Sequence, residues 1–190
     1  MKSSLKFNPR EPFKLNPKRT LMLPAYLTEE LADKLIVSLA KLSRKQKEIY
    51  LQINSRGGSW PGGIKLYDAI KADPREVIGI VTGDAFSMAA LILQACSLKL
   101  ASSNSRLGIH LISYTISFTL KPSDKNEDIY RFVDKELTEL RRKNQVSLEI
   151  LKKGLTISEK KIDALLNRGE IMSAQKAKEI GLIDEVINPV

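Results

Sequence analysis

Short apolar segments alternate with helical ones along residues 20–112 of this chain, and glycine-rich turns separate them. The predicted strands are residues 21–23, 48–54, 76–82 and 106–112. In the second of these, the aliphatic residues alternate with Tyr50 and Gln52, as expected for a strand whose two faces differ. Strands that recur between helices in this way predict an α/β fold.

Helices are predicted between these strands. Thr28 followed by Glu29 and Glu30 is a good helix start, because the hydroxyl caps a backbone amide and the acids face the positive end of the helix dipole. One face of that helix is then marked by Leu31, Leu35, Leu39 and Leu42. Further helices are predicted after the turn at 61–63 and from Ser87 onward.

Composition limits the class of protein. A chain of 190 residues with 43% apolar content fits one globular domain with a sizeable core. The lone Cys96 lies in an apolar run and has no partner for an internal disulfide, which suits a reducing compartment. Neither an apolar stretch of about 18 residues nor a secretory signal is visible, so we expect a cytoplasmic protein without a membrane span.

The net charge of +9 is concentrated in the first 19 residues. Six of these are basic and only Glu11 is acidic, so this segment holds +5 of the total. Its three prolines disfavour helix, and it lacks apolar periodicity. We therefore expect residues 1–19 to form an extended or disordered arm and 20–190 to form one domain. Nucleic-acid binding is not favoured, because solvated charge is the commoner explanation of a basic tail.

Two later segments are distinctive. Residues 113–120 alternate hydroxyl and apolar side chains, which predicts a half-buried strand. Residues 126–153 predict a long helix with apolar residues on one side and dense charge on the other. Such a helix either covers the sheet or protrudes as an arm that builds an oligomer, and the sequence leaves both interpretations open.

The candidate chemistry lies in Ser87 and in His110, the single histidine of the chain. A serine hydroxyl is a poor nucleophile until a base takes its proton, and near neutral pH that base is usually histidine. Taken singly, a serine at a helix start is most often a cap, a histidine in a strand is most often structural, and the pair Gly57-Gly58 is most often a turn. The same glycines also leave backbone amides open to a ligand.

Four ordered motifs carry a family resemblance. They are Ile53-Asn54-Ser55-Arg56-Gly57-Gly58, Gly83-Asp84-Ala85-Phe86-Ser87-Met88-Ala89-Ala90, Asn104-Ser105-Arg106-Leu107-Gly108-Ile109-His110, and Met172-Ser173-Ala174 with Gly181-Leu182-Ile183-Asp184. In order and spacing they resemble ClpP, the proteolytic subunit of the Clp protease, over roughly residues 19–187.

The resemblance implies a ClpP/crotonase-like spiral of ββα units, with a handle segment at about 113–153. It implies a serine endopeptidase in which Ser87 is the nucleophile, His110 is the base, and the backbone amides of Gly58 and Met88 form the oxyanion hole. It also implies heptameric rings, stacked in pairs, that degrade unfolded polypeptides delivered by a Clp-type ATPase. No cofactor and no metal are expected.

One position of the expected catalytic triad departs from the family. Gly169 stands where the family has an aspartate, although the preceding Arg168 matches. That acid holds the histidine tautomer and stabilises the imidazolium, and its loss in serine proteases costs about ten-thousand-fold in turnover. Glu170 and Asn167 lie beside the gap as possible substitutes. An altered triad, a dyad and an inactive site all remain open at this point.

Other departures affect the neighbouring features. Arg56 replaces the usual proline, residues 111–112 replace Gln-Pro, and Gln52 stands where an aromatic of the ATPase-docking pocket is common, although Tyr50 is retained. The hydroxyl/apolar segment 113–120 replaces a glycine-rich strand.

Three functions are therefore weighed. The first is a ClpP-like serine endopeptidase, which predicts that His110 hydrogen-bonds Ser87 and that a carboxylate or carbonyl reaches the other ring nitrogen. The second is a catalytically impaired ClpP-like ring or scaffold subunit. The third is a crotonase-type acyl-CoA enzyme, which leaves the pairing of Ser87 and His110 unexplained.

Overall fold

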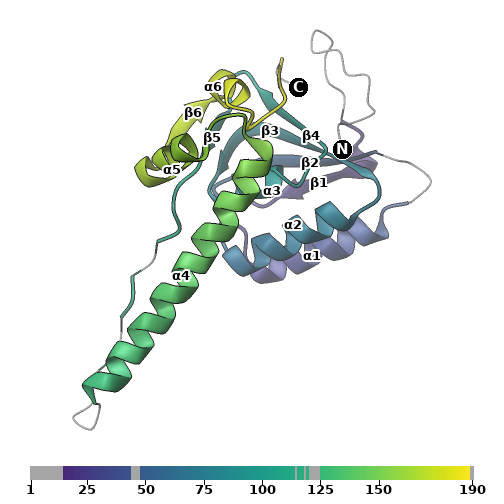
Figure 1. The fold of residues 1–190 in the computed structure, drawn as a ribbon. Helices are drawn as coiled ribbons and strands as arrows, with labels where there is room; N and C mark the ends of the chain where they lie inside the picture. The colour runs from purple at the N-terminus through teal and green to yellow at the C-terminus, as the bar shows by residue number, and fades with distance from the viewer. Residues whose placement is uncertain (1–14, 44–47, 114, 118, 120–124, 189–190) are drawn as a thin grey trace.

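The computed structural model describes residues 15–43, 48–113, 115–117, 119 and 125–188. The strands are β1 (Thr20–Leu23), β2 (Glu48–Ser55), β3 (Glu76–Phe86), β4 (Leu98–Ser102), β5 (Arg106–Gly108), β6 (Ile171–Ser173) and β7 (Glu185–Ile187). The helices are the 3₁₀ turn η1 (Pro17–Arg19), α1 (Glu29–Lys41), α2 (Trp60–Ala72), α3 (Met88–Leu93), α4 (Asn126–Gly154), α5 (Glu159–Arg168) and α6 (Ala174–Glu179) (Figure 1). The α/β class and the long handle helix expected from the sequence are confirmed.

The sheet has a parallel main part and a side branch. In the main part the strand order is β1-β2-β3-β4-β7, and all neighbours are parallel. The 11-residue β3 runs beyond this part, so that Asp84–Phe86 pairs in parallel with β5, and β6 then pairs antiparallel with β5. Because β3 belongs to both parts, its C-terminal end lies where the two meet.

The main core lies on the face of the sheet that carries α1 and α2, which run side by side along it (Figure 1). Along β2 the aliphatic Ile49, Leu51 and Ile53 are buried, whereas Tyr50 and Gln52 are half-buried, as the alternation predicts. A smaller cluster on the other face contains Ile78, Ile80, Leu100 and Ile187.

The predicted start of α1 is confirmed in detail. Thr28 is the N-cap, and its hydroxyl accepts a hydrogen bond from the Leu31 amide at 3.2 Å. Glu29 and Glu30 occupy the first turn, where the helix dipole favours negative charge.

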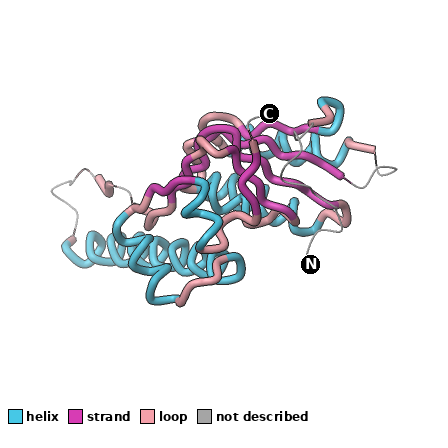
Figure 2. Tube along the Cα trace, turned by 90° about the horizontal axis from the view of Figure 1, so that it is seen from above, coloured by secondary structure: helices cyan, strands magenta, loops and turns pink. Residues whose placement is uncertain are grey.

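The handle helix α4 packs on the body only near its C-terminal end. Its buried residues are Ser147, Leu148, Ile150 and Leu151, all in the last two turns. Toward the N-terminus the helix extends past the strands (Figures 1 and 2). Its residue Tyr130 is 73% exposed. The N-terminal half is therefore a protruding arm and not a cover for the sheet. No helix of the described part of the chain, α4 included, is long and apolar enough to cross a membrane.

Two strand predictions are wrong in the described residues. Ser113, 115–117 and Thr119 are not in a strand, while the other residues of 113–120 lie outside the described part. The alternating pattern alone does not make a strand, because a strand needs a neighbour to pair with. Strand β5 likewise ends at Gly108 instead of residue 112, because the next backbone amides bond to the α5–β6 corner.

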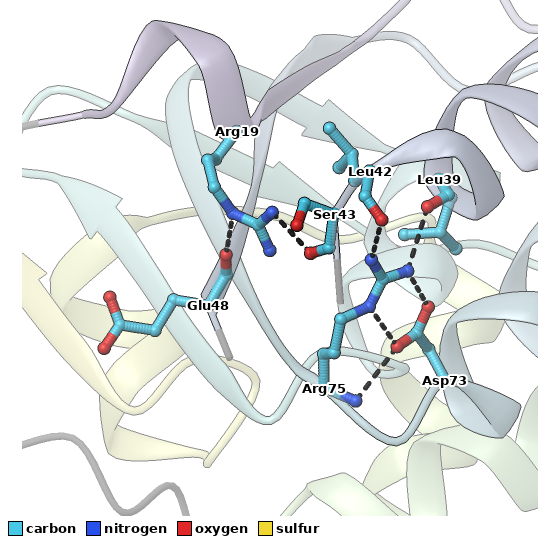
Figure 3. A network of polar contacts seen from close by, with 7 residues as sticks. All are labelled: Arg19, Leu39, Leu42, Ser43, Glu48, Asp73 and Arg75. Carbon is cyan, nitrogen blue, oxygen red and sulfur yellow. Dashed lines mark hydrogen bonds and ion pairs between the residues drawn. The ribbon is translucent and has the colours of Figure 1, made fainter. Parts of the chain in front are cut away.

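Pro17–Arg19 form a 3₁₀ turn, unlike the extended chain expected there; the first part of the arm, 1–14, lies outside the described residues. Arg19 is 4% exposed. Its guanidinium donates to the Glu48 carbonyl at 2.7 Å and to the Ser43 carbonyl at 2.9 Å (Figure 3). These bonds connect the residue before β1 to the first residue of β2 and to the segment that follows α1.

A second buried arginine holds the end of α1. Arg75 binds the Asp73 carboxylate with two guanidinium nitrogens, at 2.7 and 2.5 Å, and both side chains are less than 10% exposed. The same guanidinium donates to the carbonyls of Leu42 and Leu39, at 2.8 and 2.9 Å (Figure 3). Asp73 in turn raises the pKa of Arg75 by hydrogen bonding to the charged form.

Replacing Arg75 by methionine should lower the free energy of unfolding by about 3 kcal/mol, because it leaves a buried carboxylate without its counter-ion. Urea unfolding followed by circular dichroism measures this. Lys34→Met is the matched control, since Lys34 pairs with Glu30 at an exposed position of α1 and should not shift the midpoint measurably. Equal midpoints for both variants would contradict the role given to Arg75.

Cys96 should be unreactive in the folded protein. Burial raises the pKa of its thiol to about 12, so at pH 8 only roughly one thiol in ten thousand is the reactive thiolate. A chromogenic disulfide reagent should therefore titrate one thiol per chain in urea and none within minutes in buffer. Rapid reaction of the native protein would show that Cys96 is accessible.

Candidate active site

Ser87 lies in the turn between β3 and α3, in a conformation that L-residues rarely adopt. Among the described non-glycine residues it alone has a positive φ, 54°, with ψ at −123°. Such a backbone costs on the order of 1–3 kcal/mol and is commonest at functional sites. Its amide donates to the Gly108 carbonyl at 2.8 Å, which continues the pairing of β3 with β5. Its hydroxyl does not cap α3, so the commonest reason for a serine at this place does not apply.

His110 follows β5 at a corner that other elements fix. The Ile109 amide donates to the Glu170 carbonyl at 3.0 Å, and the Leu111 amide donates to the Leu166 carbonyl at 3.1 Å. The His110 side chain is exposed.

Ser87 and His110, 23 positions apart in the chain, line one pocket of about 150 Å³. Gly58 and Met88 line the same pocket, so all four residues that the resemblance implied are brought together. Apolar side chains, among them Trp60, Leu91 and Leu151, form much of its wall.

The ring of His110 is oriented by a backbone carbonyl. Its Nδ1 lies 2.6 Å from the Leu111 oxygen. A carbonyl oxygen only accepts, so Nδ1 carries the proton and Nε2 keeps its lone pair, as a base requires. Within the described part of the chain, no hydrogen bond joins the ring to the Ser87 hydroxyl. Such bonds are often long before substrate binds and tighten in the complex.

Gly169, where the resemblance implied an acid, is adjacent to His110 and carries none. Gly169 ends α5 in the left-handed conformation, φ 63°, and a Cβ built there would lie 3.7 Å from the His110 Cβ. The two neighbouring substitutes are engaged elsewhere. Glu170 pairs with Arg168 at 3.4 Å, and the Asn167 amide donates to the Asp163 carbonyl at 2.8 Å.

The Gly57-Gly58 turn packs directly against the turn of Ser87. A Cβ on Gly57 would come within 2.8 Å of the Met88 nitrogen, and one on Gly58 within 2.2 Å of the Leu27 oxygen. Both glycines also have positive φ, 90° and 139°. Neither the Gly58 amide nor the Met88 amide donates a hydrogen bond to another described residue. Two free amides thus lie near a serine, which suits the binding of a developing oxyanion.

Sequence reasoning missed the groups that connect these elements. Asp84 and Arg106 lie opposite each other in β3 and β5, and form two hydrogen bonds of 2.9 and 2.8 Å. The Arg106 guanidinium also lies over the Phe86 ring, 5.5 Å from its centre. Only the strand register reveals this pairing. The role of the Leu111 carbonyl could not be predicted from the sequence either, because every residue has a backbone carbonyl.

Comparison with known proteins supports these observations. The model of the Clp protease family matches residues 12–190. The chain is 32% identical to the ATP-dependent Clp protease proteolytic subunit 3 of Synechococcus sp. (strain CC9605), over 92% of this chain and 85% of that protein. It is 31% identical to the protein of the same name from Parasynechococcus marenigrum (strain WH8102), with the same coverage. It is 33% identical to the ATP-dependent Clp protease proteolytic subunit of Chlorella vulgaris, over 91% of this chain and 83% of that protein. The family model covers nearly the whole chain, and Gly58, Ser87 and His110 line one pocket, so the chain belongs to the Clp protease family.

Proposed function

We propose that this chain is a ClpP-like serine endopeptidase subunit that works with a Ser87–His110 dyad. One observation carries the proposal: Ser87 and His110 share a pocket in which each is prepared for this chemistry. The Ser87 hydroxyl makes no capping bond and its backbone is strained, while the Nδ1 proton of His110 is held by the Leu111 carbonyl. Strain and a fixed tautomer are both costly to maintain, and both serve nucleophilic catalysis.

The reaction divides between these groups. Nε2 of His110 takes the proton from Ser87 as its oxygen attacks the peptide carbonyl. The amides of Gly58 and Met88 receive the oxyanion. His110 then gives the proton to the leaving amine, and water hydrolyses the acyl-enzyme by the same route. The Leu111 carbonyl is a dipole and not a charge, so it stabilises the imidazolium less than a carboxylate, and we expect slow turnover.

The proposed substrate is an unfolded polypeptide, and the proposed assembly is a heptameric ring, single or stacked. The protruding half of α4 supports self-association, because it extends past the strands (Figure 1) and carries the exposed Tyr130. A Clp-type ATPase is the proposed partner, since the relatives are named ATP-dependent. Tyr50 would contribute to its docking pocket, with Gln52 in place of a second aromatic.

The second candidate is a catalytically impaired ring or scaffold subunit of the same family. Two observations favour it: Gly169 supplies no acid, and the described hydroxyl of Ser87 does not bond to His110.

Labelling with a fluorophosphonate, which reacts with activated serines, separates these candidates. The wild-type protein should be labelled, Ser87→Ala should abolish labelling, and His110→Ala should slow it by at least about a thousand-fold, because the base is lost. Ser103→Ala is the control, since Ser103 is exposed in the turn after β4, outside the pocket. An unlabelled wild-type protein would contradict the peptidase proposal. If native mass spectrometry of that sample still finds a ring of the 21.3 kDa chain, the scaffold role is favoured.

Gly169→Asp should raise the labelling rate by about ten-fold or more. Its Cβ would meet His110 at ordinary contact distance, and aspartate tolerates the left-handed backbone better than most residues. The new carboxylate would stabilise the imidazolium that forms. Gly169→Asn is the matched neutral control and should not produce the increase. Equal rates for the two variants would show that charge at this position does not reach His110.

A further inference from the structure

We propose that Asn144 of α4 is a positioning residue for His110, and that it acts through the peptide unit between Leu111 and Ile112. The inference rests on the proposed function only in treating His110 as the base. It adds a third group to the dyad, supplied by the handle helix.

Asn144 binds the backbone of Ile112 at both of its polar groups. Its Oδ1 accepts from the Ile112 amide at 2.7 Å, and its Nδ2 donates to the Ile112 carbonyl at 3.1 Å. This is the pattern that a neighbouring strand would provide, here made by one side chain. Because both ends of the side-chain amide are used, its orientation is determined by the contacts.

The Ile112 amide and the Leu111 carbonyl belong to one planar peptide unit. Asn144 therefore holds the N–H of the same unit whose oxygen receives the His110 Nδ1 proton at 2.6 Å. The result is a continuous series of hydrogen bonds from the imidazole, through the peptide, to Asn144. Such bonds polarise one another, so the carbonyl becomes a better acceptor and its plane is fixed.

Another hydrogen bond holds the preceding peptide unit. The preceding amide, that of Leu111, donates to the Leu166 carbonyl of α5 at 3.1 Å. Asn144 itself is half-buried and lies one turn before the buried Ser147 and Leu148, in the part of α4 that packs on the body. Gly169 has no side-chain acceptor, the Asn167 amide group donates to Asp163, and Glu170 pairs with Arg168. The Leu111 carbonyl is the acceptor that the structure shows for the ring.

The single histidine makes a direct test feasible, because ¹⁵N-histidine labelling gives signals from His110 alone. Solid-state NMR of the sedimented protein at about pH 9, where an ordinary imidazole is neutral, reports which nitrogen is protonated. The wild-type ring should be protonated at Nδ1. Asn144→Leu, similar in size but unable to hydrogen-bond, should give a mixture of both tautomers and slow fluorophosphonate labelling by about ten-fold.

Two further variants sharpen the comparison. Asn144→Asp keeps the acceptor for the Ile112 amide and should retain the Nδ1 tautomer. Gln145→Leu is the control on the same helix, because Gln145 is exposed and bonds to Glu149, and it should change neither the tautomer nor labelling. Asn144→Ala, which adds no bulk, provides the same test if the leucine variant does not fold.

The outcomes distinguish this inference from the proposed function. An Nδ1 tautomer that persists in both Asn144→Leu and Asn144→Ala, or its absence from the wild type, overturns the inference while serine labelling still supports the peptidase. If these variants lose the Nδ1 tautomer but the wild-type protein is not labelled by the fluorophosphonate, the positioning role is supported and the proposed function is overturned.

Discussion

The pairing of the last three residues of β3 with β5 is the constraint on which the site depends. It places Asp84–Phe86 beside Arg106–Gly108, and the bond from the Ser87 amide to the Gly108 carbonyl extends it by one residue. The two bonds between Asp84 and Arg106 secure the register. Ser87 and His110 follow directly after these strands, so a slip of one residue in their pairing would move both side chains out of the shared pocket.

In the proposed dyad, a backbone carbonyl stands in for the triad acid. In the usual arrangement a carboxylate both selects the tautomer and stabilises the charged ring. Here the Leu111 carbonyl selects the tautomer, and its neutral dipole provides only part of the second effect. In the proposed dyad, His110 therefore keeps the tautomer that a base needs, while the electrostatic stabilisation of its charged ring is reduced. This separation explains why one structure supports both a slow peptidase and an impaired subunit as candidates.

Much of the fold was predictable because local patterns agreed with it. The alternation in β2, the cap at Thr28 and the length of α4 all appear as the sequence indicates. The strand predictions fail where the structure of a segment depends on which neighbouring segment it hydrogen-bonds to. Residues 113–120 have the alternation of a strand, but their described part has no strand to pair with, and the neighbouring Ile112 bonds to Asn144 instead.

By itself, the sequence determined the chemical groups: one histidine, a serine in a small-residue turn, two glycines where only glycine fits, and no acid at position 169. It also determined the local structures, because capping and periodicity act over a few residues. Only the tertiary structure decided which atom faces Nδ1 of His110. That atom is the backbone oxygen of Leu111, and Asn144, 33 residues further along the chain, binds the N–H of the same peptide unit. Strand register and helix packing, not residue type, bring these groups together.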